Sequence, residues 1–253
     1  MTESSLFNSL LVLVFVAAPL VFVSLLFSTA SYGRHNKKKS GPQIPTRAAW
    51  IYMESPSVFA FAYFFFCSPH ASTTMPLVLF LLWEAHYAQR TLVYPFLMRV
   101  REGDTMPLAI ATSGFVFNMI NSFLNATWIG HYGDYTNVWL RDPRFLFGAA
   151  VFAAGYAINR QSDAILRKLR KPGDTGYKIP AGGLYGLLSC PNYFGELTIW
   201  TGWAIATWSL AGLSFAVFTA ANLVPRALAN HRWYQKTFAD YPHARRAIVP
   251  FLL

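Results

Sequence analysis

The sequence predicts an all-α polytopic membrane protein with seven transmembrane helices, an N-terminus outside the membrane and a cytosolic C-terminus. Of its 253 residues, 54% are hydrophobic and only 13% are charged, whereas a typical soluble domain has about 25% charged residues. Seven apolar runs are separated by polar loops, and nearly all cations fall into loops on one side. The net charge of +10 therefore reflects membrane topology rather than nucleic-acid binding.

The seven expected spans each approach the roughly 20 apolar residues that a bilayer core requires. The first run is too long for the roughly 7–15-residue apolar region of a signal peptide, and acidic MTESS precedes it, so we interpret it as a retained helix. A tight turn at Ala211-Gly212 is expected to join the last two spans. The spans cover residues 6–29, 51–68, 73–97, 106–128, 144–162, 184–207 and 209–227.

The distribution of basic residues predicts the orientation. With the N-terminus outside, the inner loops hold the cations of residues 34–47, 99–101, 160–178 and 226–246, and the outer side holds only Arg141 and Arg144. The tail from residue 231 is aromatic and basic, and we expect it at the inner interface or folded back under the bundle. Cys67 and Cys190 would lie near opposite faces, which predicts two unpaired, buried small residues.

Polar side chains interrupt the third apolar run. Glu84, Tyr87 and Arg90, with Tyr94 beyond, recur at helical spacing, and His86 lies four residues before Arg90. A charged side chain at a bilayer centre costs about 2.5–3.5 kcal/mol even on insertion scales, so this stripe must face protein or a wet cavity. One interpretation is a structural ion-pair network that locks helices together, and the other is a functional site.

Glu54 favours the functional interpretation. It enters the second span early, and no cation lies near it in the sequence. A carboxyl removed from water tends to stay protonated, and a neutral carboxylic acid can donate a hydrogen bond to a carbonyl. Because a phenol can do the same, Glu54 and Tyr87 are predicted to form an oxyanion-type site.

The large inner loop, NRQSDAILRKLRKPGDTGYKIPAGGLYG, combines cations, amides and glycines. Cations and backbone N–H groups are what a phosphate-rich ligand requires. No dinucleotide fingerprint of the βαβ type is present, and an ordinary positive-inside loop is the alternative. Asn159, Asp163 and Arg167 recur at helical spacing, and Asn192 and Glu196 open the sixth span. We therefore predict a nucleotide headgroup at the cytosolic face and a lipophilic substrate reached from the bilayer.

At these residues the sequence resembles the steroid 5α-reductases, the 3-oxo-5α-steroid 4-dehydrogenases. The resemblance extends from about Tyr32 to the C-terminus. The matching segments are YGRH, PTRAAW followed by Glu54, HYAQRTLVYP, the inner loop quoted above, SCPNYFGE, ATWSLAGLSFA and HRWYQKTFADYPHARRAIVPF.

The resemblance implies a seven-helix membrane enzyme that uses NADPH to reduce the carbon–carbon double bond of a Δ4-3-oxosteroid. Glu54 and Tyr87 would hold the substrate's 3-carbonyl. The single domain, residues 1–253, would form the substrate side mainly from residues 1–100 and the NADPH side mainly from residues 101–253. The implied cofactor contacts are Arg90, Arg101, Asn159, Asp163, Arg170, Tyr177, Lys178, Asn192, Glu196, Arg226, His231, Tyr234 and Arg245.

The resemblance also implies a location and partners. We expect a monomer in the endoplasmic reticulum or a bacterial inner membrane, with its cofactor site facing the cytosol. The expected partners are membrane lipid and a steroid that enters from the bilayer, with no nucleic acid and no metal.

The chain departs from the family pattern at three places. Lys178 replaces an arginine of the inner loop, which keeps the charge but loses the planar fork. Ile199 stands where several steroid reductases carry a second glutamate, and EGDTM after Arg101 is a short insertion.

Other functions remain open at this stage. Related membrane reductases act on polyprenols or enoyl thioesters. A carboxyl methyltransferase of the isoprenylcysteine type has a similar C-terminal region, but would not need Glu54 with Tyr87. A transporter or lipid receptor would require a pseudo-repeat, and the sequence contains none.

Overall fold

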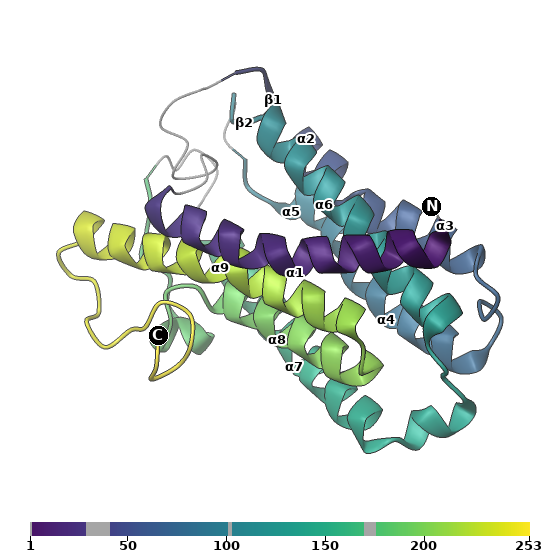
Figure 1. Cartoon of the computed structure of the whole chain (residues 1–253). Coiled ribbons are helices and arrows are strands. Elements are labelled where there is room, and N and C mark those ends of the chain that lie inside the picture. The colour runs from purple at the N-terminus through teal and green to yellow at the C-terminus, as the bar shows by residue number, and fades with distance from the viewer. Residues whose placement is uncertain (1, 29–40, 101–102, 170–175) are drawn as a thin grey trace.

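The structure, a computed structural model, describes residues 2–28, 41–100, 103–169 and 176–253. Within these ranges the chain forms a helical bundle with one two-stranded sheet (Figure 1). The α-helices are α1 (Glu3–Phe27), α2 (Thr46–Glu54), α3 (Pro56–Phe66), α4 (Thr74–Ala88), α5 (Tyr94–Leu97), α6 (Leu108–Thr127), α7 (Pro143–Lys168), α8 (Pro191–Thr207) and α9 (Leu210–Thr237). The shorter elements are π-helices η2 (Gln89–Val93) and η3 (Trp128–Tyr132), 3₁₀-helices η4 (Asn137–Arg141) and η5 (Gly183–Gly186), and strands β1 (Gln43–Pro45) and β2 (Thr105–Pro107).

The mostly helical architecture agrees with the predicted class. Each of the seven predicted ranges coincides with helix, the second with α2 and α3 together and the third with α4, η2 and α5. Two of the described helices, α1 and α9, are long and apolar enough to cross a membrane. The number of spans and their orientation stay predictions.

Two predicted boundaries near α8 were wrong. The sixth predicted span begins at residue 184, but α8 begins only at Pro191, because residues 187–190 pair with the C-terminal tail instead. The turn between α8 and α9 lies at Trp208, which is left-handed (φ 46°), rather than at Ala211-Gly212. Ser209 then caps α9 by accepting a hydrogen bond from the N–H of Gly212.

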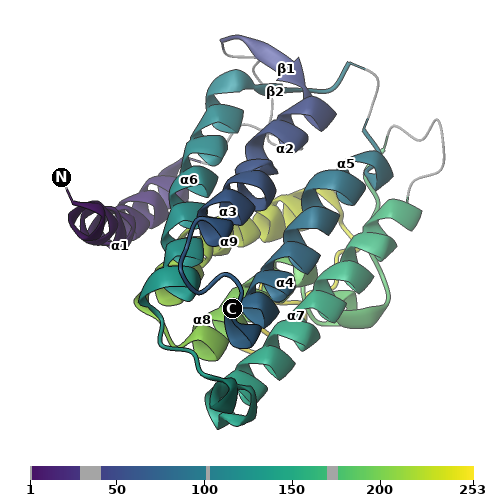
Figure 2. The ribbon, with the colours of Figure 1, turned by 90° about the vertical axis from the view of Figure 1, so that its right-hand side faces the viewer.

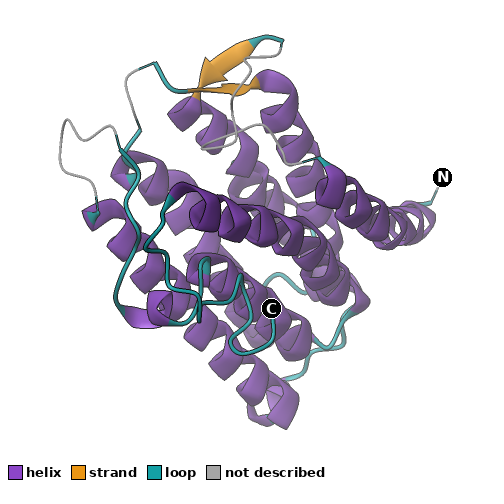
Figure 3. Cartoon of the chain, turned by 90° about the vertical axis from the view of Figure 1, so that its left-hand side faces the viewer, coloured by secondary structure: helices purple, strands orange, loops and turns teal. Residues whose placement is uncertain are grey.

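The predicted fold-back of the tail is confirmed for its last part. Helix α9 continues to Thr237, beyond the expected end at residue 227. After it the chain returns, and Arg246 pairs in parallel with Leu188 (Figure 3). The N–H of Ser189 donates to the carbonyl of Arg246 at 2.8 Å, and the N–H of Cys190 to that of Ala247 at 3.1 Å. Cys190 is buried and Cys67 exposed, and both are free.

The short sheet was not predicted, and it joins the starts of two helices. β1 and β2 are antiparallel, with Ile44 opposite Met106. Pro45 and Pro107 end the strands and begin α2 and α6. The inserted EGDTM segment supplies the first two residues of β2. The sheet therefore fixes α2 and α6 side by side.

An aromatic core lies between α3, α4, α8 and α9. Trp83 is fully buried, stacks on Phe61 at 4.3 Å and touches Trp200 and Trp203. Helices α7 and α8 pack along their lengths, whereas α1 lies at the periphery against α9 and α6 (Figure 2). This core supports the polar site described next.

Candidate active site

A bend between α2 and α3 positions Glu54. Pro56 has no N–H, so it leaves the carbonyl of Tyr52 without its helical partner, and the hydroxyl of Ser55 donates to that oxygen at 2.8 Å. Glu54 is the last residue of α2, and its side chain is 7% exposed.

Side chains from other helices satisfy the remaining carbonyls of the bend. An apolar environment offers no water to carbonyl groups, so such donors are needed. The four contacts are Asn118 Nδ2 to Met53 O at 2.8 Å, Thr91 Oγ1 to Glu54 O at 3.3 Å, Ser122 Oγ to Pro56 O at 3.0 Å and Trp83 Nε1 to Ser57 O at 2.8 Å. These donors lie on α4, η2 and α6, and thus fix the Glu54 backbone against the bundle.

The π-helix η2 presents Arg90. Its wider turn precedes Pro95 in α5, and Tyr94 N–H bonds to the carbonyl of Gln89, five residues back. Such π-turns occur frequently at functional sites. The guanidinium of Arg90 also lies over the ring of Trp50, 5.1 Å from its centroid.

Glycines bring α7 and α8 into close contact beside Arg90. Gly148 and Gly155 on α7 face Gly202 and Gly195 on α8. A Cβ at Gly195 would lie only 2.6 Å from the backbone nitrogen of Asn159. This close approach lets Asn159 Nδ2 donate to the carbonyl of Asn192 and to Glu196 Oε1, both at 3.1 Å.

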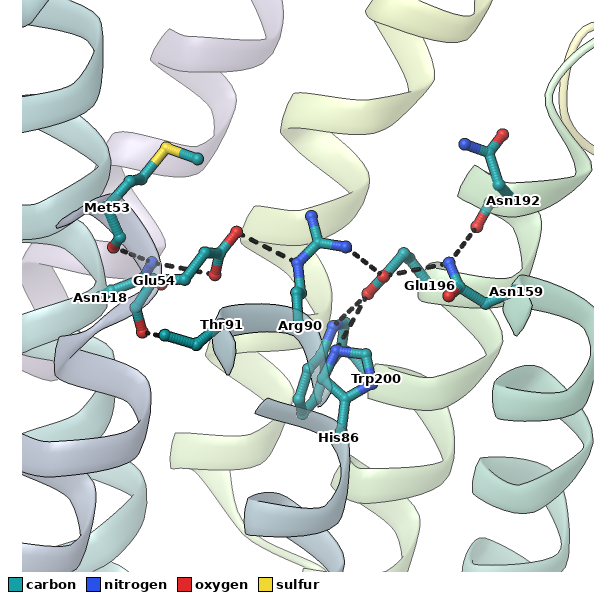
Figure 4. A network of polar contacts seen from close by, with 10 residues as sticks. All are labelled: Met53, Glu54, His86, Arg90, Thr91, Asn118, Asn159, Asn192, Glu196 and Trp200. Atoms are coloured by element: carbon teal, nitrogen blue, oxygen red, sulfur yellow. Dashed lines mark hydrogen bonds and ion pairs between the residues drawn. The ribbon is translucent and has the colours of Figure 1, made fainter. Parts of the chain in front are cut away.

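Arg90 joins two carboxylates in the centre of the bundle (Figure 4). Its Nε lies 3.1 Å from Glu54 Oε1, and its Nη1 lies 2.9 Å from Glu196 Oε1. Asn118 Nδ2 is 3.4 Å from Glu54 Oε2, and Trp200 Nε1 is 3.1 Å from Glu196 Oε2. Charge-assisted hydrogen bonds of this kind are strong. Arg90 and its two carboxylates therefore link four segments, α2, η2, α6 and α8.

A cavity of about 270 Å³ contains this network. Glu54, Tyr87, Arg90 and Glu196 line it together with apolar side chains of α6 and α9. Tyr87 is 3% exposed, and its ring stacks on that of Trp200 at 5.4 Å. The lining therefore combines aromatic side chains with several convergent polar groups, a combination found in sites for small ligands.

A second cavity, of about 190 Å³, adjoins the first. The two share Tyr94 and Asp163 as lining residues. Arg99, Arg167 and Lys178 also line the second cavity, which makes it the more basic of the two. An elongated ligand could therefore place an anionic part in the second cavity and a neutral polar ring in the first.

Comparisons with known proteins agree with this geometry. A family model described as 3-oxo-5-alpha-steroid 4-dehydrogenase matches residues 104–253. The chain is 40% identical to a steroid 5-alpha-reductase DET2 of Gossypium hirsutum over 99% of both chains. It is 42% identical to 3-oxo-5-alpha-steroid 4-dehydrogenase 1 of Homo sapiens over 92% of this chain and 90% of that relative.

The chain belongs to the 3-oxo-5-alpha-steroid 4-dehydrogenase family. It is therefore an oxidoreductase, and a reductase of this family is consistent with a nicotinamide cofactor. With its apolar helices α1 and α9, this family member is a membrane protein.

Most residues that the family resemblance singled out line the two cavities. The first cavity collects Glu54, Tyr87, Arg90, Asn159, Asp163, Asn192 and Glu196. The second collects Asp163, Tyr177, Lys178 and Tyr234. Arg101 and Arg170 lie outside the described residues.

Three further predicted residues do not line either cavity but connect to residues near them. Arg226 Nε donates to the hydroxyl of Tyr193, which lines the first cavity. His231 Nδ1 lies 2.6 Å from Ser189 Oγ. Arg245 lies over the ring of Tyr241, which stacks on Tyr234 of the second cavity.

No cation lies near Glu54 in the sequence, but the fold brings Arg90 to it from 36 positions away. One expectation about the polar stripe was wrong. Glu84 does not join Tyr87, Arg90 and Tyr94 at the cavity, and its Oε1 is buried without a hydrogen-bond partner among the described residues.

Sequence reasoning also missed several residues of the site. Asn118 and Trp200 bond the two carboxylates, yet neither stands out in the sequence from other polar or aromatic residues of the apolar runs. The glycines at 195 and 202 offered a signal, because they are seven residues apart, like those at 148 and 155. Small residues at helical spacing indicate close helix packing in membranes.

Proposed function

We propose that the chain reduces the Δ4 carbon–carbon double bond of 3-oxosteroids, such as testosterone or progesterone, to 5α-reduced products with NADPH as the reductant. One observation carries this proposal: Tyr87 and Glu54 share one cavity with the Arg90–Glu196–Asn159 cluster. Homologues named for this activity support it.

The residues fit NADPH. Arg167 Nη1 and Arg245 Nε and Nη1 are buried and have no hydrogen-bond partner in the described part of the chain. Unpaired buried guanidinium groups suit phosphate oxygens. With Lys178 they would hold the phosphates near the second cavity, whereas Asn159 and Glu196 would bind the nicotinamide end.

The chemistry adds two hydrogens across an enone. When bound, NADPH supplies a hydride to the β-carbon, and a proton must reach the α-carbon. Negative charge develops on the 3-oxygen of the steroid. The hydroxyl of Tyr87 would donate to that oxygen, which stabilises the charge. Glu54, held by Arg90 at Oε1, would in its protonated form donate from Oε2 to the same oxygen, beside Tyr87.

The membrane arrangement follows the same proposal. The chain would span the membrane seven times, with the second cavity facing the cytosol and its NADPH pool. A steroid would enter from the bilayer, because the walls of the first cavity include Phe117, Phe215 and Phe218. The basic loops at residues 34–47 and 160–178 support this orientation.

The deciding experiment measures NADPH oxidation by the purified protein with testosterone or progesterone and identifies the product by mass spectrometry. A gain of two hydrogens at the Δ4 bond is expected. NADPH binding without turnover of either steroid would contradict the substrate assignment and favour a polyprenol or enoyl substrate. Absence of NADPH binding would contradict the cofactor assignment.

A further inference from the structure

His86 is the buried polar side chain that the proposed reaction leaves unused. Its imidazole is 2% exposed, and neither ring nitrogen has a hydrogen-bond partner among the described residues. Aromatic rings surround it at steep angles: Trp200 at 4.9 Å and 80°, and Tyr87 at 5.1 Å and 88°. A buried polar group without partners is uncommon in a native protein and calls for an explanation.

The carboxylate of Glu196 is the hydrogen-bond acceptor placed beside His86. His86 Nε2 lies 3.6 Å from Glu196 Oε2 (Figure 4), slightly too far for a hydrogen bond. Oε1 of the same carboxylate already accepts from Arg90 and Asn159, whereas among the described residues Oε2 accepts a hydrogen bond only from Trp200. A carboxylate offers about four acceptor positions, so Oε2 retains room for one more donor.

The unused acceptor position on Oε2 affects the orientation of Glu196 once a ligand occupies the cavity. A nicotinamide carboxamide presents N–H groups, and an added donor on Oε1 of Glu196 would compete with Arg90 and Asn159 there. The carboxylate then keeps its orientation only if Oε2 is held from the other side. Trp200 and His86 are the side chains placed on that side.

We propose that His86 is a positioning residue for Glu196, donating from Nε2 to Oε2 when the nicotinamide end of the cofactor occupies the cavity. This inference rests on the proposed use of NADPH. A shift of a few tenths of an ångström closes the 3.6 Å gap to hydrogen-bond range. Since His86 does not line the cavity, it acts through Glu196 and not on the ligand.

Two variants of His86 separate positioning from packing. His86→Phe keeps a ring among the aromatic neighbours but removes the N–H donor. His86→Gln keeps a donor but removes the ring. If His86 only fills space, Phe is the better replacement. If His86 positions Glu196, the His86→Gln protein should bind the cofactor more tightly than the His86→Phe protein, even if it is less stable.

The measurement is the NADPH dissociation constant of the purified protein, with KM values for NADPH and steroid. We expect His86→Phe to weaken NADPH binding about tenfold, as for loss of a hydrogen bond to a charged group, with the steroid KM little changed. His86→Gln should recover part of the loss. Trp200→Phe, which removes the other donor to Oε2, should act in the same direction.

Tyr156→Phe is the matched control, because its ring lies 6.2 Å from that of His86 and the hydrogen bonds of the described site residues do not involve its hydroxyl. The NADPH affinity of this variant should equal the wild type's. Wild-type affinity in His86→Phe would overturn the inference while leaving the proposed function intact. The inference would also be overturned if the His86→Gln protein bound NADPH no more tightly than the His86→Phe protein. Failure of the wild type to bind NADPH would overturn both.

Discussion

Replacing Gly195 with alanine tests whether the α7–α8 contact positions the site. The added Cβ would lie 2.6 Å from the nitrogen of Asn159, whereas ordinary contacts begin near 3.4 Å. The helices would have to separate locally by about 0.8 Å. If Asn159 moves by that amount, its two hydrogen bonds of 3.1 Å lengthen to about 3.9 Å and are lost.

The expected cost is the sum of overpacking and lost bonds. Overpacking costs about 1–3 kcal/mol, and each of the two bonds contributes about 0.5–1.5 kcal/mol. Gly195→Ala should therefore destabilise the protein by about 2–6 kcal/mol. It should also weaken NADPH binding at least about tenfold, because Asn159 no longer holds Glu196.

The assay combines thermal unfolding of the detergent-purified protein with a calorimetric NADPH titration. Gly186→Ala is the matched control, since a Cβ there meets nothing within 4 Å, and it should change neither quantity. A Gly195→Ala protein that unfolds at the wild-type temperature and binds NADPH normally would refute the reasoning.

Further predictions concern the site and the C-terminal end of α8. Tyr87→Phe should lower kcat about 10²–10³-fold, the usual loss for one donor to a developing oxyanion, with NADPH affinity retained; near-normal steroid turnover would discard the role of Tyr87. Glu54→Gln should likewise reduce turnover severely while NADPH binding persists, which a titration can check. Arg90→Lys loses the fork that spans two carboxylates, so both NADPH and steroid affinity should fall, and an effect on one alone would contradict the bridge. Trp139→Phe removes the bond to the carbonyl of Ala206 at the far end of α8 and should lower the free energy of unfolding by about 1 kcal/mol without changing NADPH affinity.

Helix positions were predictable because they depend on local composition. The run before Glu84 is apolar throughout, and α4 forms there as expected. The ends were less predictable because tertiary pairing decides them: residues 187–190 could have extended α8, but the tail binds their backbone. Likewise β2 forms within the inserted segment because β1 lies opposite it.

The sequence indicated which residues belong to the site better than it indicated which of them contact one another. The stripe of Tyr87, Arg90 and Tyr94 follows from helical spacing, and all three line the cavity. The contact of Arg90 with Glu54 and with Glu196 joins residues 36 and 106 positions apart, so no spacing rule could reveal it. The neutral state of Glu54 stays a prediction.

Arg90 can occupy an apolar helix because carboxylates on two other helices complete its contacts. Breaking a buried ion pair by removing one partner leaves an uncompensated charge and costs about 3–5 kcal/mol. Arg90 carries two such contacts, so the network that presents Glu54 and Glu196 to the cavity also holds α2, η2 and α8 together. Stability and cofactor affinity should therefore change together at Arg90, whereas at Tyr87, which has no ion pair among the described residues, they should change separately.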